Sequence, residues 1–135
     1  MKADRMKTVL IADDDLASRE LLRGALEASG FRLVEASDGR EALDKIRTES
    51  PDLVLLDIQM PTLDGFAVLR AARSLDPPSC ARFIALTAFA MDSDRQRIVK
   101  AGFDRHVAKP ISISDVREQV KRMLSDEDKA SRAEL

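Results

Sequence analysis

The sequence has one cysteine, one histidine and no long apolar run, and each shortage excludes a class of protein. Cys80 alone cannot form a disulfide within the chain or supply metal-binding cysteine spacing. No apolar stretch approaches the roughly 18 residues that cross a bilayer. The charged start has no apolar segment long enough for a signal peptide. We therefore expect no membrane partner, and the cytoplasm is the default compartment.

The chain also lacks an excess of either charge, with 22 Lys and Arg against 24 Asp and Glu. A net charge of −2 gives no reason to expect direct nucleic-acid binding. At 135 residues and 44% hydrophobic composition, the chain is long enough for one domain with a proper core. We predict an N-terminal extension over 1–7, a domain over 8–124 and a polar tail over 125–135.

Strand-like and helix-like patterns alternate five times along the domain. Short apolar or β-branched runs predict the strands, and apolar residues at helical spacing predict the helices. The expected strands cover 8–12, 31–36, 52–56, 82–86 and 104–108. The expected helices cover 16–29, a segment around 42–46 that ends at Ser50, a segment from Asp64 to before Pro77, 92–101, and a segment from Ser112–Ser114 to Leu124.

Such an alternation predicts right-handed βαβ crossovers and a parallel sheet. The first, third and fourth strands are the most apolar and fit the centre, whereas the second and fifth fit the edges. The fold class is therefore α/β: a five-stranded parallel sheet in the order 2-1-3-4-5, a flavodoxin-like, doubly wound (βα)5 three-layer sandwich. Its switch point lies between strands one and three, where a cleft is expected.

Four of the expected strands run directly into a reactive residue. The first leads to Asp13-Asp14-Asp15, and the others lead to Asp57, Thr87 and Lys109. The carboxyl ends of parallel strands gather at one edge of an open α/β sheet, where such sheets carry their sites. A carboxylate cluster, a hydroxyl and an ammonium at one edge suit a divalent metal and a phosphoryl group held on an aspartate.

The chemistry gives each residue type a role. A carboxylate such as Asp57 can attack a phosphoryl group and hold it as an aspartyl phosphate. A cation must offset the repulsion between these anions, and Mg²⁺ prefers carboxylates, phosphate oxygens and waters. We expect Asp13, Asp14, Asp57 and the Gln59 backbone carbonyl to bind it. Lys109 would pair with the phosphoryl oxygens or with Asp57, and the Thr87 hydroxyl would donate to a remaining phosphoryl oxygen.

Simpler interpretations exist for single residues. Asp15 is best explained as the cap of the first helix, and Asp64-Gly65 as the start of the third. Asp57, Thr87 or Lys109 alone would be an ordinary turn or solvated residue. The charged residues of 92–97 are most simply interpreted as the solvent-exposed face of the fourth helix. The joint placement at four strand ends is the argument for a site.

The same residues resemble a known family. Residues 9–15, 51–61, 85–88 and 109–110 are similar to the response-regulator receiver domains of bacterial two-component signalling. The resemblance extends from residue 8 to about 124, and the order and spacing of its motifs agree.

Two further segments indicate which receiver domains the chain resembles most. Residues 87–91 and 101–104 look like single-domain cell-cycle receivers of the DivK kind, and like receiver modules of hybrid kinases.

The resemblance implies that Asp57 accepts a phosphoryl group from a phosphohistidine of a sensor histidine kinase or a histidine phosphotransfer protein. It implies Mg²⁺ on Asp13 and Asp14, and phosphoryl contacts from Thr87 and Lys109. The Lys109-Pro110 bond is commonly cis in this family. Such a chain is not an enzyme, since it catalyses only its own phosphorylation and dephosphorylation.

The resemblance also implies two protein-binding surfaces. Kinase docking through the first helix and the loop after the fifth strand would involve Leu16, Arg19, Leu22 and Ile111. A downstream protein partner would bind the face formed by the fourth helix, the fifth strand and the fifth helix. No DNA-binding module follows residue 124, so we expect output through altered protein–protein binding.

Three positions bear on switching and lifetime. His106 stands where the family often has Tyr or Phe, and it is interpreted either as a half-exposed edge-strand histidine or as a switch ring that titrates near neutral pH. The resemblance implies that the side chains at Gln59 and Phe89 affect how water reaches the acyl phosphate. Phe89 either shields the phosphoryl group or belongs to an apolar patch for a partner.

Other functions remain as alternatives. A haloacid-dehalogenase-like phosphatase also uses a nucleophilic Asp and Mg²⁺, but it usually carries a second Asp where this chain has Gln59. A binding module that is never phosphorylated would not need the acidic pair, Thr87 and Lys109. The chain could also be a receiver module cut from a larger regulator or hybrid kinase, although Met1 and the short tail favour a complete protein.

Overall fold

The computed structural model describes residues 6–88 and 91–125. In this part of the chain, five parallel strands form one sheet in the order β2-β1-β3-β4-β5, which confirms the predicted topology. Each described helix is too short or too polar to span a bilayer. The elements are β1 (Thr8–Ala12), α1 (Leu16–Glu27), β2 (Arg32–Ala36), α2 (Gly39–Glu49), β3 (Leu53–Asp57), α3 (Gly65–Arg73), β4 (Arg82–Thr87), α4 (Asp92–Ala101), β5 (Arg105–Ala108) and α5 (Ile113–Met123).

The burial of the strands explains their order. Every residue of β1 and β3 is buried, and in β4 only Arg82 is partly exposed. The edge strands β2 and β5 have mixed exposure. Strands covered on both faces need apolar side chains on both faces, so the three most apolar runs lie at the centre.

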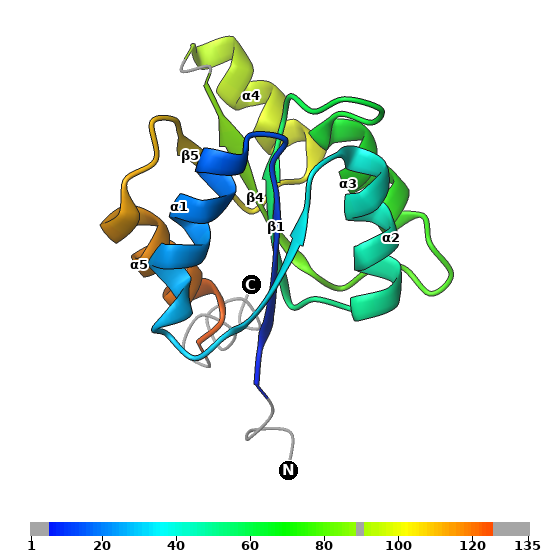
Figure 1. Cartoon of the computed structure of the whole chain (residues 1–135). Helices are drawn as coiled ribbons and strands as arrows, with labels where there is room; N and C mark the ends of the chain where they lie inside the picture. Colours follow the sequence, from blue (N-terminus) through cyan, green and yellow to red (C-terminus); the bar gives the residue numbers. More distant parts are fainter. Residues whose placement is uncertain (1–5, 89–90, 126–135) are drawn as a thin grey trace.

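Two helical layers cover the sheet, with α1 and α5 on one face and α2, α3 and α4 on the other (Figure 1). Side chains of β3 alternate between the layers, because successive residues of a strand point to opposite faces. Leu53 and Leu55 pack in the cluster of α1 and α5, and Val54 and Leu56 pack in the cluster of the other helices. The result is a three-layer sandwich with a core on each side of the sheet.

Four helices begin at a side-chain cap. Asp15, Asp38, Asp64 and Ser112 each accept a hydrogen bond from a backbone N–H in the first turn. These contacts confirm the interpretation of Asp15 and Asp64 as helix starts. The fourth helix, α4, begins after Met91 without a side-chain cap, and Ile98 is its one buried residue.

Some predicted boundaries were wrong by one or two residues. The first helix ends at Glu27, before the predicted residue 29. Asp52 precedes β3, and its carboxylate accepts the Thr8 N–H at 2.8 Å. Asp104 precedes β5 and its carboxylate accepts the Phe83 N–H at 2.8 Å. Both aspartates satisfy backbone groups at strand starts with a side chain, which a hydropathy pattern does not reveal.

Some of the predicted segments lie outside the residues that the structure describes. The predicted extension over 1–7 and tail over 125–135 lie largely outside the described residues, and so does Phe89. The two hypotheses about Phe89 therefore remain predictions.

Candidate functional site

The register of the sheet brings the reactive residues to one edge. Asp57 is the last residue of β3 and pairs with Leu86. Thr87 is the last residue of β4 and pairs with Ala108, which Lys109 follows directly. The Lys109 N–H also donates to the Thr87 carbonyl at 2.8 Å. The predicted convergence of distant segments is therefore present in the fold.

Three carboxylates meet at this edge. One oxygen of each of Asp13, Asp14 and Asp57 lies within 4.8 Å of the other two. Asp13 is fully buried and Asp57 is 5% exposed, whereas Asp14 is exposed to solvent. The cluster is thus anchored inside the protein and open on one side, so an ion can reach it from water.

Lys109 bridges two of these carboxylates. Its Nζ lies 2.9 Å from Asp13 Oδ2 and 3.2 Å from Asp57 Oδ2. Partial burial of Lys109 opposes its charged form, but the contacts with Asp13 and Asp57 outweigh burial and raise the pKa of the ammonium. The bond from Lys109 to Pro110 is cis, as the resemblance implied.

Asp57 is electrostatically unusual. Burial and then the charge of Asp13 raise the pKa of its carboxyl from 3.8 to about 6, against the opposing effects of the Gln59 N–H and of Lys109. The Gln59 N–H donates to Asp57 Oδ1 at 3.0 Å. Two carboxylates compete for one ammonium here, so the site has a deficit of positive charge.

This deficit makes the site suitable for a small divalent cation. The available donors are carboxylate oxygens, which Mg²⁺ prefers, and the described site contains no thiolate or imidazole donor. Asp14 is exposed and offers a carboxylate on the open side of the cluster. The donor set therefore fits the metal that the sequence analysis expected.

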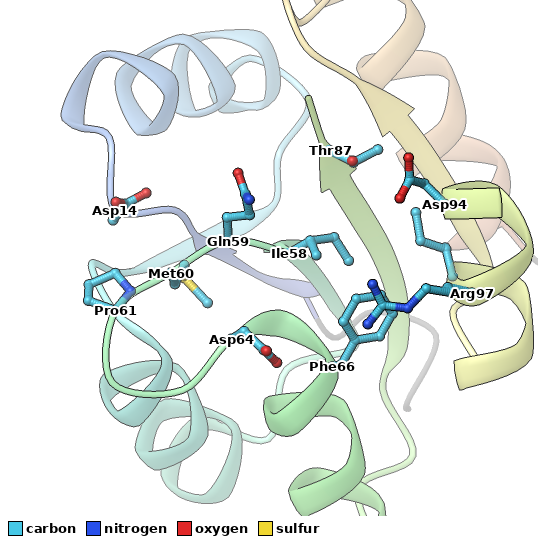
Figure 2. A pocket seen from close by; sticks show the side chains of 11 residues that line it. Asp14, Ile58, Gln59, Met60, Pro61, Asp64, Phe66, Thr87, Asp94 and Arg97 are labelled. Carbon is cyan, nitrogen blue, oxygen red and sulfur yellow. The ribbon is translucent and has the colours of Figure 1, made fainter. Parts of the chain in front are cut away.

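A cleft of about 440 Å³ extends from the cluster toward α4. Figure 2 shows Asp14 and Gln59 on one side of it, and Thr87 near the start of α4. Thr87 is 2% exposed and lines the cleft from the end of β4. The lining includes Ile58 and Gln59, which directly follow Asp57 in the sequence.

Two charged residues of α4 form part of the wall of this cleft, which the sequence did not indicate. Arg97 is exposed and Asp94 partly exposed, which agrees with their interpretation as the solvent-exposed face of the fourth helix, and both also line the cleft. The Arg97 guanidinium lies 4.6 Å from the centre of the Phe66 ring (Figure 2). No sequence motif reveals this contact, because Phe66 and Arg97 belong to different helices.

Gly65 also supports the site, by a close approach to the Asp57 backbone that the sequence did not indicate. A Cβ at this position would lie 2.7 Å from the Asp57 carbonyl oxygen and 2.9 Å from Ile58 Cα. Gly65 therefore lets α3 begin directly against the backbone of Asp57. The Asp-Gly pair was a visible signal, but only for a helix start.

The four residues that the resemblance implies in kinase docking differ in their exposure to solvent. Leu16 is 57% exposed, whereas Leu22 is completely buried, so the assignment of Leu22 to a docking surface was wrong. Leu22 lies on the face of α1 that packs against the sheet. Arg19 also turns inward, and its side chain is 15% exposed. Ile111 is partly buried against the core.

His106 is half-buried on the edge strand β5. It lines a hollow of about 340 Å³ between β5 and α5. The charged residues around it are Arg105, Asp115, Glu118 and Arg122. The position agrees with a half-exposed edge-strand histidine, and its proposed switching role remains a prediction.

Comparisons with known proteins agree on one family. The family model of the response regulator receiver domain matches residues 9–121. The polar-differentiation response regulator DivK of Brucella anthropi is 38% identical over 120 residues, which are 89% of this chain and 98% of DivK.

Solved structures show the same fold. The chemotaxis response regulator CheY4 of Vibrio cholerae is 27% identical with a TM-score of 0.82, and the match covers 89% of this chain and 100% of CheY4. The receiver domain of the sensor histidine kinase PA1611 of Pseudomonas aeruginosa is 26% identical with a TM-score of 0.79, over 88% of this chain and 98% of that domain. That structure has a magnesium ion coordinated in its active-site cleft.

Proposed function

The chain belongs to the response regulator receiver domain family of two-component signalling, and we propose that it is a switch that carries a phosphoryl group on Asp57. The donor is a phosphohistidine of a sensor histidine kinase or a histidine phosphotransfer protein. The observation that carries the proposal is the position of Lys109 Nζ, 2.9 Å from Asp13 and 3.2 Å from Asp57, within a cluster of three carboxylates.

This geometry supports the following transfer. A carboxylate oxygen of Asp57 attacks phosphorus, the bond between phosphorus and the histidine nitrogen breaks, and the electron pair stays on the imidazole. Lys109 is in contact with Asp57 and offers its ammonium to the arriving phosphoryl oxygens. Thr87 offers its hydroxyl to another of these oxygens from the end of the neighbouring strand.

The acidic cluster holds the metal in this proposal. Asp13, Asp14, Asp57 and the backbone carbonyl of Gln59 bind Mg²⁺. When bound, the ion offsets the repulsion between the Asp57 carboxylate and the phosphoryl oxygens. The magnesium-bound PA1611 receiver domain supports this assignment by similarity.

Two surfaces serve the protein partners of the switch. The exposed side chain of Leu16, at the start of α1 beside the site, is offered to the kinase or phosphotransfer protein. The downstream partner binds the face of α4, β5 and α5. Met91 and Val99, which are 70% and 67% exposed, lie at the α4 end of this face. The exposure of these two apolar side chains supports the assignment of this face to a protein partner.

The two interpretations of His106 make different predictions about that face. If His106 is a titrating switch ring, the gain in partner affinity on phosphorylation changes between about pH 6 and 8 in the native protein and not in His106→Phe. If His106 is only an edge-strand residue, the two pH curves are the same. Binding measured with and without phosphorylation separates them.

The proposed function is tested by intact mass spectrometry after incubation with Mg²⁺ and acetyl phosphate. The native chain should gain one phosphate, and Asp57→Asn should gain none. Asp64→Asn is the matched control, because Asp64 lines the same cleft and an asparagine can still cap α3. Loss of the gain in both variants, or its persistence in Asp57→Asn, would refute the assignment. A generic phosphomonoester turned over repeatedly would favour the phosphatase alternative.

A further inference from the structure

The inward-turned side chain of Arg19 connects α1 to the backbone of the acidic turn. Its Nη1 donates to the Asp13 carbonyl oxygen at 2.7 Å, and its Nε donates to Glu35 Oε1 at 3.3 Å. The side chain is 15% exposed, although it belongs to a helix on the surface. Arg19 therefore uses its planar guanidinium to join a carboxylate on β2 to the residue after β1.

Glu35 holds Arg19 in this orientation. It lies on β2 and pairs with Ile11 of β1. Its other oxygen, Oε2, accepts a hydrogen bond from Arg23 Nε at 2.6 Å, and its carbonyl accepts one from Lys45 Nζ at 3.1 Å. The pairing of β2 with β1 sets the position of Glu35, and its Oε1 contact with Arg19 directs the guanidinium toward Asp13.

The consequence is a turn whose polar groups are held by neighbours. The Asp13 N–H donates to the Ala36 carbonyl at 3.1 Å, and the Asp13 carbonyl accepts from Arg19. The Asp15 N–H donates to Asp13 Oδ1 at 2.9 Å. The backbone of Asp13 is thus held on the β2 side through its N–H and on the α1 side through its carbonyl.

We propose that Arg19 is a positioning residue for the metal-binding carboxylates, acting through the Asp13 carbonyl and oriented by Glu35. The inference rests on the proposed function, since it concerns the metal of that same site. Mutation of a group that orients a metal ligand typically lowers the metal affinity by about 10- to 100-fold. Arg19 should therefore set the affinity for Mg²⁺ and have little effect on the chemistry once Mg²⁺ is bound.

Electrostatics alone makes the opposite prediction. Arg19 is a cation close to a carboxylate cluster, so its removal would strengthen the attraction of the cluster for Mg²⁺. If positioning dominates, removal of Arg19 weakens binding. The sign of the change in Mg²⁺ affinity therefore distinguishes the two effects.

The test compares Arg19→Met with Arg23→Met by calorimetric titration with MgCl₂. Both variants remove one cation from the same Glu35 carboxylate, but only Arg19 contacts Asp13. We expect an Mg²⁺ dissociation constant about tenfold higher in Arg19→Met, and one within about twofold of the native value in Arg23→Met. The Mg²⁺ concentration for half-maximal phosphorylation by acetyl phosphate should rise by the same factor as the dissociation constant. The maximal rate should change far less.

Arg19→Lys is the second variant, and it keeps the charge. A single ammonium cannot reproduce both contacts of the guanidinium, so its Mg²⁺ affinity should fall between those of the native protein and Arg19→Met. If Arg19→Met does not fold, comparison of Arg19→Lys with Arg23→Lys decides in the same way.

Unchanged or tighter Mg²⁺ binding in Arg19→Met would overturn the inference. Equal losses in Arg19→Met and Arg23→Met would also overturn it, because they would indicate a general loosening of α1 against β2. In either case the native chain would still bind Mg²⁺ and be phosphorylated. A native chain that binds no Mg²⁺ would instead overturn the proposed function and this inference together.

Discussion

At the scale of single residues, the environment of Asp57 links the site to stability. Burial and the nearby charge of Asp13 raise the pKa of Asp57 to about 6 in the folded protein, above its ordinary value of 3.8. Between these two pH values the folded chain keeps a proton that the unfolded chain has lost. The ionised carboxylate therefore destabilises the fold as pH rises toward 6, and this cost is absent well below pH 4.

We predict that Asp57→Asn stabilises the metal-free protein at pH 7.5, because the amide cannot ionise. The gain in the free energy of unfolding should be on the order of 1–3 kcal/mol. At pH 4.5 the gain in the free energy of unfolding should be only a fraction of its value at pH 7.5. Urea unfolding in the presence of a chelator, at both pH values, measures the difference. A gain that does not vary with pH would show that burial of the charge is not its cause.

Gly65 provides a second residue-scale prediction. An alanine there would place its Cβ 2.7 Å from the Asp57 carbonyl oxygen, so α3 and the Asp57 backbone would have to separate. Gly65→Ala should lower the free energy of unfolding by about 1–3 kcal/mol and slow phosphorylation. Gly24→Ala is the control: its Cβ has no neighbour within 4 Å, and it should raise stability by about 0.5–1 kcal/mol. Chemical denaturation and the phosphorylation rate measure both, and equal effects would contradict the account.

The sequence predicted which side chains form the candidate site better than it predicted the residues that hold them in place. Asp13, Asp57 and Lys109 were placed together because parallel strands end at one edge of a sheet. Arg19 was placed on a docking surface because of the resemblance, and its contacts with the Asp13 carbonyl and Glu35 depend on strand positions that residue types do not reveal. Leu22 was misplaced although its helical spacing with the other core residues of α1 pointed inward.

At the scale of elements, α4 is the helix with the fewest anchors among those described. It buries only Ile98 and has no side-chain cap. Arg97 lies over the ring of Phe66, and Phe66 makes an edge-to-face contact with Phe103 at 6.0 Å. Helices with few buried contacts open more easily than the rest of a fold. The helix beside the cleft is therefore the one best able to change position.

We predict opposite effects of two substitutions on the hydrogen exchange of α4. Arg97→Ala removes a cation–π contact of about 0.5–1 kcal/mol, so the α4 amides should exchange roughly two to five times faster. Met91→Ser supplies a cap of about 1 kcal/mol, so they should exchange roughly five times slower. The amides of α1 serve as an internal control and should not change. Unchanged α4 exchange in Arg97→Ala would show that the ring contact does not restrain the helix.

Element types and order were predictable because buried parallel strands are apolar and helices have a different period. Their ends were less predictable. Asp52 and Asp104 both precede a strand and use their carboxylates to accept backbone N–H groups from a neighbouring strand. Those hydrogen bonds depend on strand pairing, which is known only after the sheet has formed.

At the scale of the whole molecule, the sheet joins two cores and carries the site at one edge. An ion that binds the acidic cluster contacts residues that follow or end two central strands, so its binding energy is coupled to folding. A ligand that binds only the folded state stabilises it by mass action.

We therefore predict that Mg²⁺ raises the free energy of unfolding. At ten times its dissociation constant the increase should be about 1.4 kcal/mol. Asp13→Asn should abolish most of this increase, and Asp64→Asn should retain it. Denaturation with and without MgCl₂, at constant ionic strength, measures the effect. An equal increase in both variants would indicate a general salt effect and not a site.

The central claim is that a carboxyl oxygen of Asp57 carries the phosphoryl group. Borohydride reduction of the phosphorylated chain converts an aspartyl phosphate to homoserine, which peptide mass spectrometry locates. The account predicts homoserine at position 57, dependent on Mg²⁺, with position 64 unmodified. Homoserine at another aspartate, or none at position 57 after a phosphate has been gained, would contradict it.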